Sequence, residues 1–316
     1  RSQGLDQQGG QAMIKTSSHL LTRLGAVPLL VILLSPLWTK GNSGYHSLFL
    51  KNDGSLNAMG SNAWGEFGIG STSSSAQTSP VQIQPSGVIQ FASGHRHVVI
   101  VKSDGSAYAM GQNISGALGN ANYVDQTSPA QIFPSGVKSV AAGAFFTLLL
   151  KNYGSLHVTG SNTNGQLGTG DTSNRNSPLQ IISSGVTGIA GGSNHSLILK
   201  SDGSVFATGQ NNYGQLGTGN TNNFNAPTQI FSSGVIQVAS GAEHSLFLKA
   251  DGSLWATGRN QRGQLGTGDT VDRNSSTQIV SSGVIQVASG SEHSVFLKSD
   301  GSLHVMGSNI NGQLGT

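Results

Sequence analysis

The 316-residue chain contains no cysteine, so it has no disulfide, no thiolate metal site and no cysteine nucleophile. Charged residues are also scarce, at 9% of the chain. Four of the 16 basic residues and one of the 13 acidic residues precede Gly41, which leaves 12 of each in the remainder. Proteins that bind phosphate backbones need clustered positive charge. We therefore expect no nucleic-acid partner, although the sequence pI is about 9.2.

The longest apolar segment is also too short for a comfortable membrane span. It runs from Leu24 to Trp38, whereas a spanning helix needs about 20 residues. Two basic residues precede it, which is the layout of a secretory leader. We predict that residues 1–40 are a leader, with upstream residues and a signal peptide from Met13. The protein is then secreted or held at the cell surface, with no stable membrane span after leader removal. An uncleaved anchor, a buried helix and mistranslated upstream sequence are the alternatives.

What the chain has in abundance is repetition, and its 46 glycines recur at fixed positions. The stretch "GSLWATGRNQRGQLGTGDT" at 252–270 has close copies elsewhere, with successive copies offset by 51, 49, 49, 49 and 49 residues. Its copies begin at Gly54, Gly105, Gly154, Gly203 and Gly301. The element "HSLFLK" keeps the same step. Residues 41–316 are therefore six tandem repeats, and a stretch copied this often is a structural device.

Each repeat is predicted to contain four strands. In the fifth, Gly234–Gly241 and "HSLFLK" are apolar and β-branched, "LWATG" follows after an Asp-Gly hairpin signal, and Thr277–Val280 is a short fourth strand. No segment has helical periodicity. We predict an all-β fold over residues 41–316, a β-propeller of four-stranded antiparallel blades.

The pairing of "HSLFLKSDGSLWATGRN"-type segments with "GQLGTGD" resembles the regulator of chromosome condensation repeat, six times over residues 41–316. The resemblance implies a propeller that usually has seven blades. Here the first copy lacks its "GVIQVASG" strand and the last stops before its fourth strand, so we expect the natural protein to continue by about one repeat. The near-identical copies, the leader and the short polar loops resemble most the exported bacterial members of the family.

Several motifs have a structural interpretation that outweighs a catalytic one. The "GQLGTG" glycines lack the lysine of a phosphate loop and fit tight turns, with the adjacent leucines packing between blades. We expect the repeated histidines, such as His244, to make structural hydrogen bonds to neighbouring backbone. The repeated serines, such as Ser245, follow these histidines inside a strand, which is no nucleophile elbow. The lysines and aspartates of the hairpins are interpreted as solvated turn residues.

Candidate catalytic and metal-binding groups are weak. His95 and His97 could share a face and bind a metal, but no third ligand is indicated. Glu243 with Glu292, and Asp269 with Asp272, could supply the two carboxylates of a glycosidase, yet nothing distinguishes them from solvated loop acids. We predict no catalytic residue, no metal and no cofactor.

Residues that differ between repeats are the better candidates for a binding site. Two positions vary at the blade end opposite the Asp-Gly hairpins: the residue before the repeated histidine and the third residue of the "NxxG" loop. We predict a shallow site rimmed by Trp64, Arg96, Phe145, Tyr213 and Arg262.

The predicted function is an exported, non-catalytic module that binds a protein or a cell-surface ligand. A carbohydrate-active enzyme or glycan-binding propeller is one alternative. A guanine nucleotide exchange factor or chromatin-binding propeller is another, and the leader and the zero net charge of the repeats disfavour it.

Overall fold

The computed structural model describes residues 46–315, and its regular elements there are all β-strands. Repeat 1 contains β1 (His46–Leu50), β2 (Leu56–Asn62) and β3 (Ser73–Gln84). Repeat 2 contains β4 (Val88–Ser93), β5 (His97–Lys102), β6 (Ala107–Gly111) and β7 (Gln126–Phe133). Repeat 3 contains β8 (Val137–Ala142), β9 (Phe146–Lys151), β10 (Leu156–Gly160) and β11 (Arg175–Ile182).

The remaining strands follow the same order. Repeat 4 contains β12 (Val186–Gly191), β13 (His195–Lys200), β14 (Val205–Gly209) and β15 (Phe224–Phe231). Repeat 5 contains β16 (Val235–Ser240), β17 (His244–Lys249), β18 (Leu254–Gly258) and β19 (Arg273–Val280). Repeat 6 contains β20 (Val284–Ser289), β21 (His293–Lys298) and β22 (Leu303–Gly307). The fourth strand of repeat 5 thus begins four residues before the predicted Thr277.

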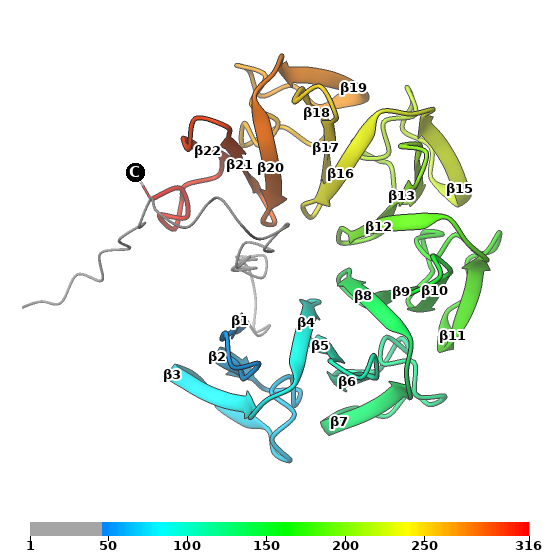
Figure 1. The fold of residues 1–316 in the computed structure, drawn as a ribbon, viewed down its shortest axis with the longest axis vertical. Coiled ribbons are helices and arrows are strands. Elements are labelled where there is room, and N and C mark those ends of the chain that lie inside the picture. The colour runs from blue at the N-terminus through cyan, green and yellow to red at the C-terminus, as the bar shows by residue number, and fades with distance from the viewer. Residues whose placement is uncertain (1–45, 316) are drawn as a thin grey trace, which may run out of the picture. The chain divides into compact units, whose positions relative to one another are not determined.

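Each repeat forms one antiparallel sheet whose strands pair in chain order, for example β4-β5-β6-β7. The sheets of repeats 2–5 have four strands, and those of repeats 1 and 6 have three among residues 46–315. The sheets follow one another around a common centre, with β4, β8, β12, β16 and β20 nearest to it (Figure 1). The predicted all-β propeller of antiparallel blades is confirmed.

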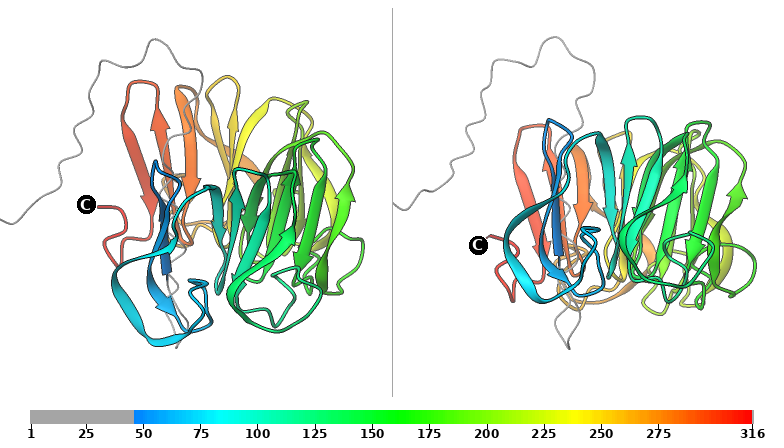
Figure 2. Two further views of the ribbon diagram at one scale, coloured as in Figure 1. Left: turned by 60° about the horizontal axis from the view of Figure 1, so that its bottom comes forward. Right: turned by 90° about the horizontal axis from the view of Figure 1, so that it is seen from below.

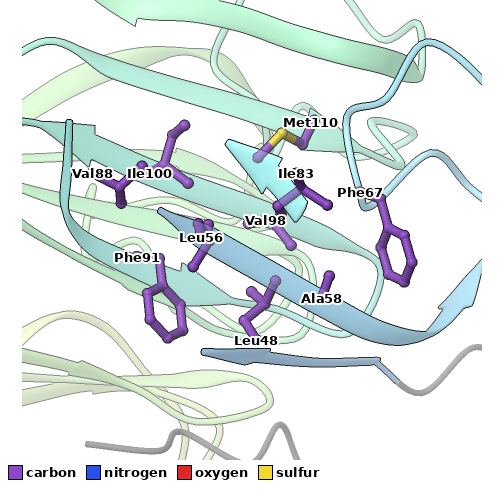
Figure 3. Close-up of a cluster of buried hydrophobic side chains, with 10 residues drawn as sticks. All are labelled: Leu48, Leu56, Ala58, Phe67, Ile83, Val88, Phe91, Val98, Ile100 and Met110. Carbon is purple, nitrogen blue, oxygen red and sulfur yellow. The ribbon is translucent and has the colours of Figure 1, made fainter. Parts of the chain in front are cut away.

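The core lies between successive blades rather than within one. In β13 the consecutive residues Leu197, Ile198 and Leu199 are all buried, because a neighbouring sheet covers each face of the strand. A buried cluster of ten residues joins repeats 1 and 2, with Leu56 from β2 beside Val98 and Ile100 from β5 (Figure 3). Three of the four predicted interblade leucines, Leu167, Leu216 and Leu265, belong to such clusters, and Leu216 shares its cluster with Phe247 of the next repeat. Leu314 belongs to none of them.

The strands of each blade run between two ends, where all connections gather (Figure 2). We call the end with the Asp-Gly turns the hairpin end. We call the opposite end, with the loop before each repeated histidine and the "NxxG" loop, the loop end. In register, His244 of β17 pairs with Gly258 of β18, which places these two loops together as predicted.

Two sequence predictions fall on residues that lie outside the described range. These are the leader at 1–40 and Tyr45, the residue before the first repeated histidine and therefore one of the variable positions. Within residues 46–315, no helix has the length and apolar character needed to cross a membrane.

Candidate functional site

A buried asparagine shapes the long loop of the loop end in repeats 1–5. In repeat 5 the Asn260 Oδ1 accepts the backbone N–H of Leu265 at 2.9 Å, and its Nδ2 donates to the carbonyl of Asp269 at 2.9 Å. The side chain is fully buried. Asn162 and Asn211 bond their own loops in the same way. The loops therefore share one backbone shape, whatever side chains they present.

The third "NxxG" residue is held by its backbone. The side-chain oxygen of Gln264 accepts the N–H of Arg262 at 2.9 Å, and that of Gln215 accepts the N–H of Tyr213 at 3.0 Å. Repeat 1 uses a carboxylate instead, because Glu66 Oε2 accepts the N–H of Trp64 at 2.9 Å. Each variable side chain thus projects from a fixed backbone position.

The residue before the repeated histidine is also held by its backbone, here through its carbonyl oxygen. The carbonyl of Arg96 accepts the N–H of Gln112 at 2.7 Å, and Gly111 lies against it with φ +105°. A Cβ at Gly111 would come within 2.3 Å of that oxygen, so only glycine fits. The same bond and the same glycine recur at Phe145 with Gly160.

A third glycine lets the loops of repeats 1–4 contact the next blade. Gly214 has φ +80°, and a Cβ there would lie 2.2 Å from the Asn274 Cα of the following repeat's outer strand. The glycines of "GQLGTG" have positive φ, and some of them, such as Gly214, also approach the next blade closely, which agrees with the prediction of positive φ or close approach.

The repeated histidines join successive blades beneath this surface. His244 Nε2 lies 2.8 Å from the Ser294 hydroxyl of repeat 6, and that hydroxyl donates to the Gln264 carbonyl at 2.8 Å. Because the hydroxyl proton is used in this way, the histidine Nε2 is the donor. Burial lowers the pKa of His244 to about 3, so its ring is neutral near pH 7. The expected partner was backbone, and the partner found is a side-chain hydroxyl, which in turn reaches the backbone.

The structure places the five predicted rim residues at the loop end. Trp64, Arg96, Phe145 and Tyr213 are half-buried and Arg262 is exposed. The ring contacts of these residues cross from one repeat to the next. The Arg96 guanidinium carbon lies 4.9 Å from the ring centroid of Trp64 in the preceding repeat. The Phe145 ring lies edge-on to His95, with centroids 5.4 Å apart. We call Trp64, His95, Arg96 and Phe145 the first cluster.

A second cluster consists of Tyr213, Glu243 and Arg259. The Arg259 guanidinium carbon lies 5.0 Å from the Tyr213 ring, and its Nη1 bonds Glu243 Oε2 at 2.6 Å. Sequence reasoning placed Arg262 on the rim and missed Arg259, the residue before the loop asparagine. That position also varies between repeats, with serine, glutamine or arginine. This variation in the sequence could have identified it as a third variable position of the loop end. The binding role of the five rim residues stays a prediction.

The other candidate groups take part in structural bonds. His97 Nε2 lies 3.1 Å from the Thr147 hydroxyl, and His95 packs on Phe145. No three His, Asp or Glu side chains in residues 46–315 are placed to hold a metal ion. Hydrogen bonds from the Arg273 side chain, the Thr267 hydroxyl and the Val271 N–H hold the pKa of Asp269 at about 2.

The hairpin end is less solvated than expected. Asp251 does make the expected turn, because its Oδ1 accepts the N–H of Ser253 at 2.8 Å. Lys249, however, is half-buried, and its ammonium lies 4.6 Å from the Trp255 ring centroid. Lys102 and Lys200 lie over aromatic rings of their own repeats at 4.9 Å. These lysines pack on the blade through their stems and stack on rings, rather than extending into water.

Comparison with known proteins gives one family and several structures. A sequence profile described as the RCC1-like domain matches residues 42–316. Human WBSCR16 superposes with a TM-score of 0.72 at 26% identity, over 80% of this chain and 70% of that one. Prp20p from Saccharomyces cerevisiae superposes with a TM-score of 0.75 at 23% identity, over 86% of this chain and 72% of that one. A chain in the structure of Kap60 bound to yeast RCC1 (Prp20) superposes with a TM-score of 0.74 at 22% identity, over 84% of this chain and 69% of that one. Curated protein sequences give no match.

Proposed function

Because the chain belongs to the RCC1-like domain family, we propose that it is a non-catalytic propeller that binds a protein partner through the loop end of its blades. One observation carries this proposal. In repeats 1–5 a buried asparagine holds the loop backbone in the same way, while the side chains that the loops present differ and include two arginine–aromatic pairs. Arginine, tryptophan and tyrosine are the residues most enriched in interface hot spots.

The solved relatives support a protein as the class of ligand. Prp20p has been studied for its binding to Gsp1p and histones, and yeast RCC1 forms a complex with Kap60. These partners belong to those proteins, and at 22–23% identity none is transferred to this chain. We propose instead that the partner is met outside the cell or at its surface, because of the leader pattern of residues 1–40.

The carboxylates support a non-catalytic role over a carbohydrate-active one. Glu243 is paired with Arg259, and Asp269 is paired with Arg273, both at 2.6 Å. Two of the acids considered for glycoside hydrolysis are thus held in ion pairs. Release of reducing ends from polysaccharides by the purified protein would contradict the non-catalytic assignment.

Site-specific photocrosslinking tests the binding face. A photoreactive side chain is placed at Asn212 on the loop end or at Ser201 on the hairpin end, both exposed and in repeat 4. In the extracellular fraction of the producing cells, we expect a protein adduct from position 212 and none from position 201. The reverse pattern would place the interface at the hairpin end.

A further inference from the structure

The two clusters of the loop end are built alike. In each, an arginine stacks on the aromatic ring at the third "NxxG" position of the preceding repeat. Arg96 lies 4.9 Å from the Trp64 ring, and Arg259 lies 5.0 Å from the Tyr213 ring. A contact of this kind over the ring face leaves the N–H groups of the guanidinium free to donate.

The clusters differ in what those N–H groups bond. In the second cluster Arg259 Nη1 donates to Glu243 Oε2 at 2.6 Å. Arg259 Nε and Nη2 donate to Gln261 Oε1 at 3.2 and 2.8 Å. Within residues 46–315 the structure gives the Arg96 guanidinium no hydrogen-bond acceptor and no ion-pair partner, and its Nε is buried. A buried guanidinium N–H without an acceptor is costly, so an external acceptor is favoured.

The residues around Arg96 do not supply that acceptor. Glu66 of repeat 1 interacts electrostatically with Arg96, but no hydrogen bond or ion pair joins the two side chains among residues 46–315. Its Oε2 accepts the Trp64 N–H, and its Oε1 is buried without a hydrogen-bond partner. Burial raises the pKa of Glu66, while Arg96 acts in the opposite direction. His95 carries no negative charge, and its pKa is lowered by burial and by Arg96. The first cluster therefore presents a half-buried guanidinium over the Trp64 ring.

We propose that Arg96 binds a carboxylate of the protein partner, an aspartate or glutamate side chain, alongside the Trp64 ring. The partner then completes the first cluster as Glu243 completes the second. This inference rests on the proposed function and names the chemical group that the loop end recognises. Arginine suits the task because its planar fork matches a carboxylate with two parallel hydrogen bonds.

A peptide titration of the full chain tests this assignment. The probes are two blocked decapeptides of alanine and leucine, one with a central glutamate and one with glutamine. The reporter is the Trp64 indole N–H resonance, assigned with Trp64→Phe. We expect saturable shifts with the glutamate peptide and binding weaker by about tenfold with the glutamine peptide. Arg96→Gln should abolish the shifts, Arg96→Lys should weaken binding, and Lys138→Gln should change nothing, because it removes an exposed charge elsewhere.

Several outcomes overturn the inference. They are equal binding of both peptides, or unchanged binding by Arg96→Gln at wild-type thermal stability. Inorganic phosphate or a short single-stranded oligonucleotide that binds through Arg96 as tightly as the glutamate peptide would replace the carboxylate with a phosphate.

The proposed function is judged separately. If the crosslink from position 212 persists in Arg96→Gln with equal yield, the function stands and this inference fails. If the wild-type protein gives no crosslink, the function itself fails.

Discussion

Two blade boundaries have the same backbone arrangement and different side-chain chemistry. Between repeats 4 and 5 the contacts are polar. The Thr257 hydroxyl lies 2.8 Å from the Gly214 carbonyl oxygen, and the Ser245 hydroxyl donates to the Gln215 carbonyl at 2.7 Å. His195 Nε2 lies 3.0 Å from the same serine hydroxyl.

Between repeats 1 and 2 the corresponding positions are apolar. Val98 replaces the serine and Met110 replaces the threonine, and both belong to the ten-residue cluster shown in Figure 3. His46 Nε2 bonds the Ser93 hydroxyl at 2.7 Å instead. Yet Gly65, like Gly214, lies against the outer strand of the next repeat. The glycines and the loop backbone thus define the boundary, and either hydrogen bonds or apolar packing can fill it.

Acid should produce the largest effect, because both boundaries contain a buried neutral histidine. Burial lowers the pKa to about 4 for His46 and His195, and to about 3 for His97 and His244. Unfolded histidine has a pKa of 6.5, so below that pH the unfolded state binds more protons. Stability present above pH 6.5 is then lost as the pH falls toward 4, on the order of 1 kcal/mol per pH unit for each histidine. Urea unfolding at pH 7, 6 and 5 measures this.

A matched variant and a separate pH window sharpen the acid test. His244→Gln keeps a hydrogen-bond donor for Ser294 but cannot titrate. The unfolding free energy of this variant should therefore fall less steeply with pH, by the contribution of one histidine. Asp171 and Asp269 act in a different pH window, because their carboxyl pKa values are lowered from 3.8 to about 2. Their contribution to the unfolding free energy is lost only as the pH falls below 3.8. Unfolding free energies that are equal at pH 7 and pH 5 would show that the histidines are accessible to water.

Gly214→Ala should give the next largest effect, because it breaks the feature that the boundaries share. The new Cβ would meet the Asn274 Cα, in a backbone conformation with φ +80° that alanine disfavours. We expect a loss of about 3 kcal/mol in unfolding free energy. Gly263→Ala is the matched control, since it has φ +74° and no atom within 4 Å, and it should cost about 1 kcal/mol. Equal losses for the two variants would remove the argument from close approach.

Exchanging the chemistry of the two boundaries should have intermediate effects. Met110→Thr removes a fully buried side chain from the apolar cluster and should cost about 2 kcal/mol. Thr257→Val leaves the Gly214 carbonyl without its hydroxyl donor and should cost about 1 kcal/mol. Thr277→Val is a control with an exposed hydroxyl and should be nearly neutral. A Met110→Thr protein of wild-type stability would mean that a hydroxyl suffices at either boundary.

These boundaries also show what sequence can predict here. The 49-residue step, the Asp-Gly turns and the "HSLFLK" runs predicted strand order and both blade ends, because they are local signals that recur along the chain, the Asp-Gly turn in five of the six repeats. The partner of the repeated histidine was missed because it lies 50 residues away in the next blade. The contact between variable positions of neighbouring repeats could not be read from local sequence for the same reason. Trp64 meets Arg96 only because neighbouring blades pack face to face.

The smallest predicted effects concern the variable layer above these boundaries. Alanine at Trp64, Tyr213 or Arg262 should each weaken partner binding by about 1 kcal/mol, roughly a fivefold rise in Kd, without lowering the thermal unfolding temperature. The physical reason is that these side chains lie outside the buried polar layer, at half-buried or exposed positions, while their backbones are held by Glu66, Gln215 and Gln264. Titration calorimetry with the crosslinked partner, once identified, measures the change. Normal binding by all three variants, with binding abolished by Asp251→Ala in a hairpin turn, would show that the partner uses the opposite end.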